Sequence, residues 1–341
     1  MKTVKIGLNG VGRIGRTVLR AYFDRLSQGD NSIEIVAINN PGDAKPYIHL
    51  LKYDSLHGKL PQELTFNAET REISYFGKKI KFFDKKNPEE IDWSAAGAEV
   101  VIDATGVFKD KEKLGLHMRG TVKKVIMCAP GSNLDGTFVM GINNDKYDNS
   151  KHHIISNASC TTNCLAPVVK VLNETFGIVN GFMTTVHAYT SDQNLLDNSH
   201  TDLRRARAAT MSMIPTSTGA AKALGEVIPE MAGKLDGYAV RVPTPDVSMV
   251  DLTVNLIKPV DKKAINEAMK LASETYLKGI LGYTEEELVS MDFLGATESS
   301  FFDSKLTNVI GQSAKIVTWY DNEVGFSNRV IDLAKFIGNK L

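Results

Sequence analysis

Two cysteines, Cys160 and Cys164, lie four residues apart in the segment SNASCTTNC, among small hydroxyl and amide side chains. Such a pair could bind a metal, form a redox couple or supply one nucleophile. A zinc site takes about four ligands, and no second cysteine pair accompanies these two. The sequence therefore predicts no metal site and favours a single reactive thiol.

The first of these cysteines is expected at the start of a helix. A helix is predicted by apolar residues at helical spacing, namely Leu165, Val168, Val169 and Leu172. Ser159 is a residue type that caps helix starts, so Cys160 would lie in the first turn. There the helix dipole and free N–H groups favour a thiolate and lower the pKa of the thiol. Cys164 should be buried one turn deeper, and Pro167 should disturb the helix because it lacks an N–H.

A thiol nucleophile usually works with a base. His187 ends the strand-like run GFMTTVHA and could supply one. A histidine at a strand end is also a common structural residue. The residues alone leave both roles open.

The N-terminal segment carries a glycine motif between a strand pattern and a helix pattern. Residues 4–9, VKIGLN, are predicted to form a buried strand, and apolar residues at helical spacing follow the motif. Here Gly10 permits a tight turn, Gly12 lets the backbone approach a pyrophosphate, and Gly15 lets helix and strand pack closely. The helix start offers free N–H groups to the anion. The pattern indicates a dinucleotide-binding loop.

Three further segments, residues 33–39, 98–108 and 122–130, are largely apolar runs. Strands buried on both faces indicate a parallel sheet covered by helices, here a Rossmann-type doubly wound sheet. Thr105, Gly106 and Cys128 close such strands. The carboxyl ends of strands are where ligands bind in open α/β sheets, so these residues are candidate cofactor contacts.

The end of the second strand departs from the usual dinucleotide pattern. The expected residue is an acid that accepts hydrogen bonds from the adenosine ribose, but Asn40 occupies the position and Asp43 follows three residues later. An amide can bond a hydroxyl, yet it lacks the negative charge that repels a 2′-phosphate. Both NAD and NADP therefore remain candidate cofactors.

Composition limits the class of protein. A chain of 341 residues suggests about two domains. Lys plus Arg and Asp plus Glu number 40 each, which gives no reason to expect nucleic acid or an acidic membrane as the main partner. Three cysteines are too few for a disulfide framework, and no apolar run approaches the roughly 18 residues of a membrane span. We expect a cytoplasmic, globular protein with a small ligand.

Eight segments, in the same order along the chain, resemble the phosphorylating glyceraldehyde-3-phosphate dehydrogenase family. They are NGVGRIGR, HLLKYDSLHG, SNASCTTNC, TTVHAYTSDQ, DLRRARAA, IPTSTGAAKA, AVRVPTP and WYDNEVGFSNR. The resemblance runs from end to end. It implies that glyceraldehyde 3-phosphate, NAD(P)⁺ and inorganic phosphate give 1,3-bisphosphoglycerate and NAD(P)H.

The resemblance also assigns roles to residues. Cys160 would attack the aldehyde and His187 would accept the hydroxyl proton, after which phosphate would attack the thioester. Thr190 and Arg241 would bind the C3 phosphate of the substrate. The residues implied around inorganic phosphate are Ser159, Thr161, Thr218 and Gly219.

On the cofactor side, the resemblance implies contacts from Arg13, Ile14, Lys86 and Cys128, and from Asn322 to the nicotinamide carboxamide. Three positions depart from the common family pattern: Cys128, Val324 and the pair Asn198-Ser199. The last of these and Asn40 both point to a relaxed choice between NAD and NADP. The resemblance further implies a homotetramer.

The expected organisation is an NAD(P)-binding domain over residues 1–159 and an α/β catalytic domain over 160–320 with a mixed or antiparallel sheet. Residues 321–341, with a helix, should return to the first domain. The alternatives are an erythrose-4-phosphate dehydrogenase, a cofactor-free Cys-His hydrolase, and a nucleic-acid-binding module that uses Arg204, Arg205 and Arg207. Thr190 and the Thr218-Gly219 pair argue against the first, the glycine motif and Asn322 against the second, and the neutral balance against the third.

Overall fold

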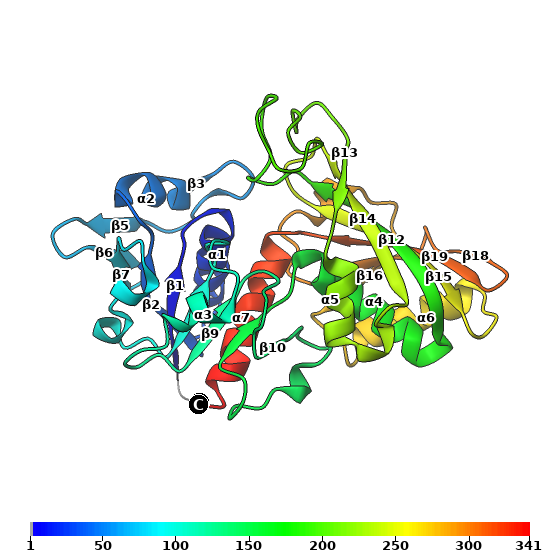
Figure 1. Ribbon diagram of the computed structural model, residues 1–341, viewed down its shortest axis with the longest axis horizontal. Coiled ribbons are helices and arrows are strands. Elements are labelled where there is room, and N and C mark those ends of the chain that lie inside the picture. Colours follow the sequence, from blue (N-terminus) through cyan, green and yellow to red (C-terminus); the bar gives the residue numbers. More distant parts are fainter. Residues whose placement is uncertain (1–2) are drawn as a thin grey trace. The chain divides into compact units, whose positions relative to one another are not determined.

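The N-terminal half of the chain builds a nine-stranded sheet in the computed structural model, which describes residues 3–341 (Figure 1). Neighbours are parallel from β10 through to β7, and the last two pairings are antiparallel. In sheet order the strands are β10 (Gly136–Thr137), β11 (Ile154–Ser156), β9 (Lys124–Met127), β8 (Val100–Asp103), β1 (Val4–Asn9), β2 (Ile33–Asn39), β7 (Lys78–Phe83), β6 (Glu72–Tyr75) and β5 (Leu64–Asn67).

Every residue of β8 and β9 is buried, as expected for parallel strands covered on both faces. The accompanying helices and the small β3–β4 ladder are α1 (Arg13–Ser27), α2 (Ala44–Lys52), α3 (Lys111–Gly115), α7 (Val324–Gly338), β3 (Tyr53–Asp54) and β4 (Gly58–Lys59). Arg25 of α1 holds α7 through its Nη1, 2.7 Å from Oδ1 of Asp332. The predicted parallel dinucleotide-binding sheet is confirmed.

A second, eight-stranded sheet is mixed, as predicted. Its strands in order are β13 (Ile214–Ser217), β14 (Leu235–Val242), β12 (Ile178–Ala188), β15 (Ser248–Leu256), β19 (Ser313–Tyr320), β17 (Ser300–Asp303) and β16 (Leu281–Thr284), with β18 (Asn308–Ile310) beside β19. Strands β12 and β14 are parallel, and β12 and β15 are antiparallel. The alternation of buried and exposed residues along β15 shows that this sheet has one covered face.

Three helices accompany the second sheet: α4 (Cys160–Phe176), α5 (Ala220–Val227) and α6 (Lys262–Glu274). Helix α4 contacts strands β12, β15, β17 and β19 as well as α5 and α6, and it therefore lies at the centre of this layer. Residues 3–341 also contain five short 3₁₀ helices: η1 (Pro88–Glu90), η2 (Trp93–Ala96), η3 (Asn144–Lys146), η4 (Pro229–Met231) and η5 (Ser290–Phe293).

Helix α4 continues through Pro167 without a break, so the predicted irregularity is wrong. The proline removes one donor to the carbonyl of Asn163. Twelve of the seventeen residues of the helix are buried, and this packing holds it in shape. The other two predictions for α4 are confirmed: Ser159 is the N-cap, and Cys164 is fully buried.

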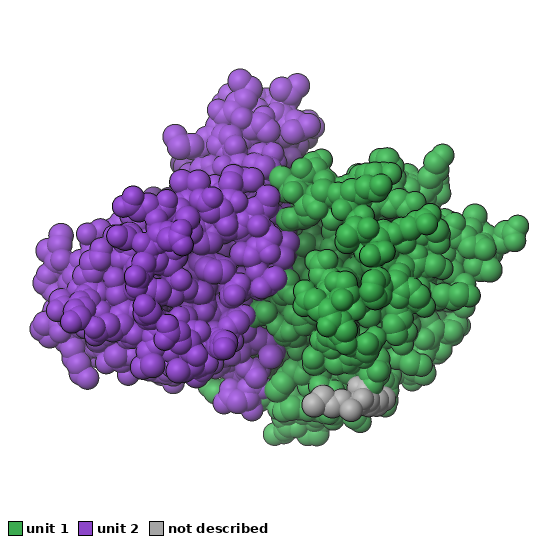
Figure 2. All heavy atoms as spheres, turned by 180° about the vertical axis from the view of Figure 1, so that it is seen from behind, with its two compact units in different colours: residues 1–138, 146–158, 327–341 green, residues 139–145, 159–326 purple. Residues whose placement is uncertain are grey.

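The chain divides into two compact units, green and purple in Figure 2. The first comprises residues 1–138, 146–158 and 327–341, and the second comprises 139–145 and 159–326. Residues 139–145, assigned from sequence to the first domain, thus group with the second unit. The structure places the transition back to the first unit at Ser327, inside α7. No helix within residues 3–341 is long and apolar enough to cross a membrane.

Candidate active site

The N-terminus of α4 presents Cys160. Ser159 caps the helix, because its Oγ accepts a hydrogen bond from the Thr162 backbone N–H at 3.0 Å. Cys160 is thereby the first helical residue and stays partly accessible, whereas Cys164 is enclosed beside the Ser300 hydroxyl. Burial raises the pKa of Cys164 to about 12. Only the first of the two thiols is therefore placed to react.

His187 lies at the end of β12 with its imidazole beside this thiol. Its Nε2 is 3.6 Å from Sγ of Cys160. The backbone N–H of Ala188 donates to Oγ of Ser248, which fixes the end of β12 against β15. The structure therefore brings together the two residues for which we predict catalytic roles.

The other ring nitrogen of His187 has two competing neighbours. Nδ1 lies 2.7 Å from the Ala188 carbonyl oxygen and 3.0 Å from Nη1 of Arg241. A carbonyl only accepts and a guanidinium only donates, so Nδ1 can bond one of them at a time. Arg241 itself donates to the Ala188 carbonyl at 2.9 Å. When Nδ1 carries the proton, the lone pair of Nε2 faces the thiol, and this tautomer can act as a base.

The charge states of the pair follow from burial and from Arg241. Both factors lower the pKa of His187, to about 3, so the imidazole is neutral at pH 7. Burial raises the pKa of Cys160, while the Arg241 charge and hydrogen bonds from Thr161 act in the opposite direction. The expectation that the helix start lowers the thiol pKa does not hold in this structure, since desolvation outweighs it. The site therefore rests as a thiol facing a neutral base.

Arg241 is the cation of this site. Besides its bond to the Ala188 carbonyl, Nη1 donates to Oγ1 of Thr190 at 3.0 Å. The buried Nε of Arg241 has no acceptor among the described residues. The Thr190 hydroxyl also bonds the carboxylate of Asp192, which Nη1 of Arg205 meets at 2.7 Å. Arg241 and Thr190 thus lie together with donor capacity left for an anion.

The residues predicted to surround inorganic phosphate occupy the starts of two helices. Gly219 is the N-cap of α5 and has open space where a side chain would be. The Thr218 hydroxyl accepts from the Ala220 N–H at 3.2 Å. The Thr161 hydroxyl differs, because it is buried and lies 2.8 Å from the hydroxyl of Tyr320. That protein partner favours a structural role for Thr161 over direct contact with phosphate.

Sequence reasoning missed Tyr320, whose hydroxyl also lies 2.9 Å from Oγ1 of Thr185. The available signal was alternation: Thr318 and Tyr320 fall on one face of β19, and both are buried. A second missed contact involves Ser248, whose hydroxyl donates to Oδ1 of Asn322 at 2.6 Å. Asn322 is thus held next to the strand that carries Ser248, just before Val324 begins α7.

The glycine loop of the first unit has the form that a pyrophosphate requires. Gly10 has φ +92, a left-handed conformation that favours glycine. A Cβ at Gly15 would collide with the Gly10 carbonyl oxygen, whereas a Cβ at Gly12 would meet nothing within 4 Å. Gly12 is exposed and precedes Arg13 and Ile14 at the start of α1, and the start of a helix favours an anion. These residues fit a bound dinucleotide.

Replacing Gly15 by alanine should lower the free energy of unfolding by about 1–3 kcal/mol, because the new methyl group collides with fixed backbone. Gly12→Ala should fold with nearly unchanged stability, since its Cβ meets open space. It should nevertheless weaken NAD⁺ binding by about tenfold, or about 1.4 kcal/mol. Thermal unfolding and a fluorescence titration with NAD⁺ separate these effects. Wild-type NAD⁺ affinity in Gly12→Ala would contradict the assignment of the loop.

Asn40 is hydrogen-bonded to this loop. Its Oδ1 accepts from the Val11 N–H at 2.8 Å, and its Nδ2 donates to the Pro41 carbonyl at 3.2 Å. Asp43 caps α2 by accepting from the Lys45 N–H at 3.0 Å. The carboxylate nearest in sequence is therefore committed to a helix cap. Asn40 itself has no negative charge that would repel a 2′-phosphate.

A buried polar network lies at the carboxyl ends of β1, β2 and β8. Asn9 Nδ2 donates to Oδ2 of Asp103 at 2.8 Å, and Asn39 Nδ2 donates to Oδ1 of Asn9 at the same distance. The Thr105 hydroxyl donates to Oδ1 of Asp103 at 2.7 Å. His117 joins through Nε2, 3.3 Å from Asp103. The network fixes the strand ends from which Thr105 and Gly106 extend.

The remaining candidate cofactor residues lie near these strand ends in the chain. The Cys128 N–H donates to the Asp103 carbonyl at 2.9 Å, directly after β9. Burial raises the pKa of the Cys128 thiol, which therefore stays protonated. Lys86 is exposed in the segment after β7. Both remain predicted contacts.

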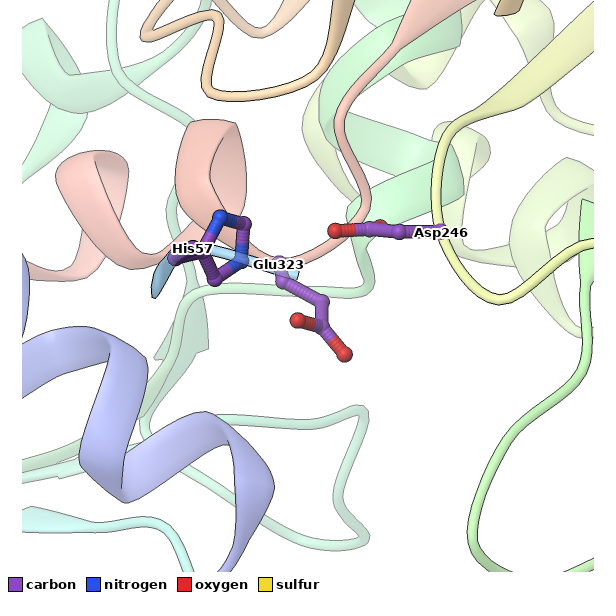
Figure 3. A group of neighbouring side chains, drawn as sticks. All are labelled: His57, Asp246 and Glu323. Atoms are coloured by element: carbon purple, nitrogen blue, oxygen red, sulfur yellow. The ribbon is translucent and has the colours of Figure 1, made fainter. Parts of the chain in front are cut away.

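Two buried acids of the second unit, Asp246 and Glu323, have carboxylate oxygens within 4.8 Å of each other (Figure 3). Asp246 lies between β14 and β15, and Glu323 follows Asn322. Two carboxylates fall short of the about four ligands of a zinc site. The pair carries no metal assignment.

Together, the glycine loop on a parallel sheet and the thiol–imidazole pair beside an arginine indicate an NAD(P)-dependent oxidoreductase. Comparison with known protein families matches two parts of the chain to the two domains of one family. Residues 4–111 match the family described as glyceraldehyde 3-phosphate dehydrogenase, NAD binding domain, and residues 159–322 match its C-terminal domain. The chain therefore belongs to the glyceraldehyde-3-phosphate dehydrogenase family.

Relatives of the same family match the chain over nearly its whole length. The chain is 53% identical over 337 residues to glyceraldehyde-3-phosphate dehydrogenase 1 of Bacillus cereus, covering 98% of this chain and 99% of that protein. It is 54% identical over 338 residues to glyceraldehyde-3-phosphate dehydrogenase of Geobacillus stearothermophilus, covering 99% of each. A relative from Streptomyces avermitilis is 52% identical over 340 residues. The predicted family is confirmed.

Proposed function

We propose that this chain oxidises glyceraldehyde 3-phosphate, with NAD(P)⁺ and inorganic phosphate, to 1,3-bisphosphoglycerate. One observation carries the proposal: the Cys160 thiol faces a neutral His187 at 3.6 Å, with Arg241 against the same imidazole. A soft nucleophile, a base and a cation for the substrate phosphate are the groups that this reaction needs.

In the first step, Sγ of Cys160 adds to the aldehyde carbon while Nε2 of His187 takes the thiol proton. That proton passes to the developing alkoxide and gives a hemithioacetal, and backbone N–H groups at the start of α4 stabilise the negative charge. His187 then removes the hydroxyl proton as the carbon is oxidised. Bound NAD(P)⁺ supplies the hydride acceptor. Attack of phosphate on the resulting thioester releases the acyl phosphate and frees Cys160.

Two groups of donors suit the two phosphates. Arg241 and Thr190 would bind the C3 phosphate of the substrate, because they lie together and Arg241 keeps a free donor. Ser159, Thr218 and the Gly219 N–H would bind inorganic phosphate at the starts of α4 and α5. In this proposal Thr161 makes its hydrogen bond to Tyr320 and does not contact phosphate.

Steady-state kinetics test the proposal directly. Glyceraldehyde 3-phosphate and erythrose 4-phosphate are each assayed with NAD⁺ and NADP⁺, with and without phosphate, by nicotinamide absorbance. We expect glyceraldehyde 3-phosphate to have the higher kcat/KM and reduction to depend on phosphate. A preference for erythrose 4-phosphate would favour the sister enzyme, and hydrolysis without cofactor reduction would favour a Cys-His hydrolase.

We propose that both NAD⁺ and NADP⁺ serve as cofactor, because Asn40 places no charge near the ribose. Asn40→Asp should lower kcat/KM for NADP⁺ relative to NAD⁺ by about tenfold, through repulsion of the 2′-phosphate. An aspartate can still accept the bond from the Val11 N–H, so the loop should keep its form. Asn31→Asp adds the same charge two residues before β2 begins, away from the glycine loop, and should leave the ratio unchanged. An unaltered ratio in Asn40→Asp would refute this role.

A cytoplasmic homotetramer is also proposed. The free face of the second sheet exposes Phe182, Val179 and Tyr238, and the segment between β12 and β13 exposes large apolar side chains. In that segment they are Leu195, Leu196, Leu203, Met211 and Met213. Apolar surface of this extent is typical of protein contacts. Light scattering should give four times the mass of the chain, and a monomer would refute the assembly.

A further inference from the structure

One buried hydroxyl connects the elements that carry Cys160 and His187. The hydroxyl of Tyr320 lies 2.8 Å from Oγ1 of Thr161 and 2.9 Å from Oγ1 of Thr185. We propose that Tyr320 is a positioning residue that sets the distance between the Cys160 thiol and the His187 imidazole. The inference concerns the same site as the proposed function and rests on it for its catalytic consequence.

The three residues belong to three separate elements of the second unit. Thr161 follows Cys160 in the first turn of α4. Thr185 precedes His187 by two residues on β12, and both side chains are buried on the same face of the strand. Tyr320 ends β19, which is separated from β12 by β15. The Tyr320 hydroxyl and its two threonine partners, here called the bridge, therefore link α4, which carries Cys160, to β12, which carries His187.

The ring of Tyr320 acts on the base itself. Its centroid is 6.0 Å from that of the His187 imidazole, and the two planes stand at 79°. An edge-to-face contact of this kind fixes the tilt of the imidazole. Tyr320 thus orients His187 through its ring and fixes β12 through its hydroxyl.

The Tyr320 hydroxyl keeps its proton across the working pH range. Burial raises the pKa of the Tyr320 hydroxyl well above its ordinary value. A protonated phenol has one donor and also accepts, so it can donate to one threonine and accept from the other. Phenylalanine would keep the ring and lose both bonds. The substitution therefore removes the link between α4 and β12 without opening a large cavity.

The distance that the bridge controls is one to which catalysis is sensitive. At 3.6 Å, Sγ and Nε2 are within hydrogen-bond distance of each other. A misplacement of about 1 Å can cost about 100-fold in rate. Substrate binding through Arg241 does not pass through Tyr320. The bridge should therefore affect kcat more than KM.

The test is Tyr320→Phe, read by alkylation of Cys160 with iodoacetamide at pH 7 without substrate or cofactor. Mass spectrometry locates the adduct. We expect alkylation to slow by about tenfold, because the thiol loses its aligned base, and kcat for glyceraldehyde 3-phosphate to fall by about tenfold with KM within about twofold. Tyr283→Phe is the matched control: its ring stacks on Phe302 in the same sheet, and it should alkylate and turn over as the parent does.

Thr185→Val and Thr185→Ser form a second pair. Valine removes the hydrogen bond between residue 185 and Tyr320 and should reproduce the slower alkylation. Serine keeps the hydroxyl and should alkylate at the parent rate. If Tyr320→Phe does not fold, this pair decides the question. Parent rates in Tyr320→Phe or in Thr185→Val, whatever the change in melting temperature, would overturn the proposal. Alkylation needs no substrate, so it separates this outcome from a failure of the proposed reaction.

Discussion

Cys160→Ser should lower kcat/KM for aldehyde oxidation by roughly 1,000-fold or more, since the variant loses the nucleophile itself. A serine hydroxyl is far less acidic than a thiol. Nicotinamide absorbance measures the loss, and a titration with NAD⁺ should show cofactor binding unchanged.

Cys164→Ser is the matched control for this substitution. Cys164 is fully buried beside Ser300 and Thr318, so the exchange affects packing and leaves the reactive thiol in place. The variant should retain turnover per folded molecule. If Cys160→Ser stayed active and Cys164→Ser did not, the assignment of the nucleophile would be wrong.

Local signals were sufficient to predict the frame of the site. The strands predicted over residues 4–9 and 33–39 match β1 and β2 residue for residue. Alternating or continuous apolar character determines a strand within a short window. The cap at Ser159 was equally local, because a hydroxyl needs only the N–H groups of the next turn. The site residues that depend on such signals were therefore accessible from sequence.

Contacts between distant segments explain what sequence reasoning missed. The Tyr320 bridge joins residues more than a hundred positions apart. The pKa of Cys160 depends on how deeply surrounding segments bury it, and this burial outweighs the local effect of the helix start. Pro167 stays helical for the same reason, since packing on α4 overrides a local preference. Each miss is a tertiary effect acting on a correctly placed element.

A second substitution tests whether His187 acts as the base. His187→Gln should lower kcat by roughly 100- to 10,000-fold, because an amide can bond the sulfur and cannot take its proton. Without the base, reaction depends on thiolate formed by hydroxide. Burial raises the pKa of Cys160 above its ordinary value, so this thiolate increases with pH into the alkaline range.

The deficit of His187→Gln should therefore be largest near pH 6 and should narrow as pH rises toward the pKa of the thiol. The parent enzyme should keep its activity to lower pH, since an imidazole with a pKa of about 3 remains unprotonated there. Paired pH profiles of kcat measure both effects, and His49→Gln at an exposed position of α2 controls for the exchange. A deficit that stayed constant from pH 6 to pH 10 would mean that His187 acts by orienting the thiol and carries no proton.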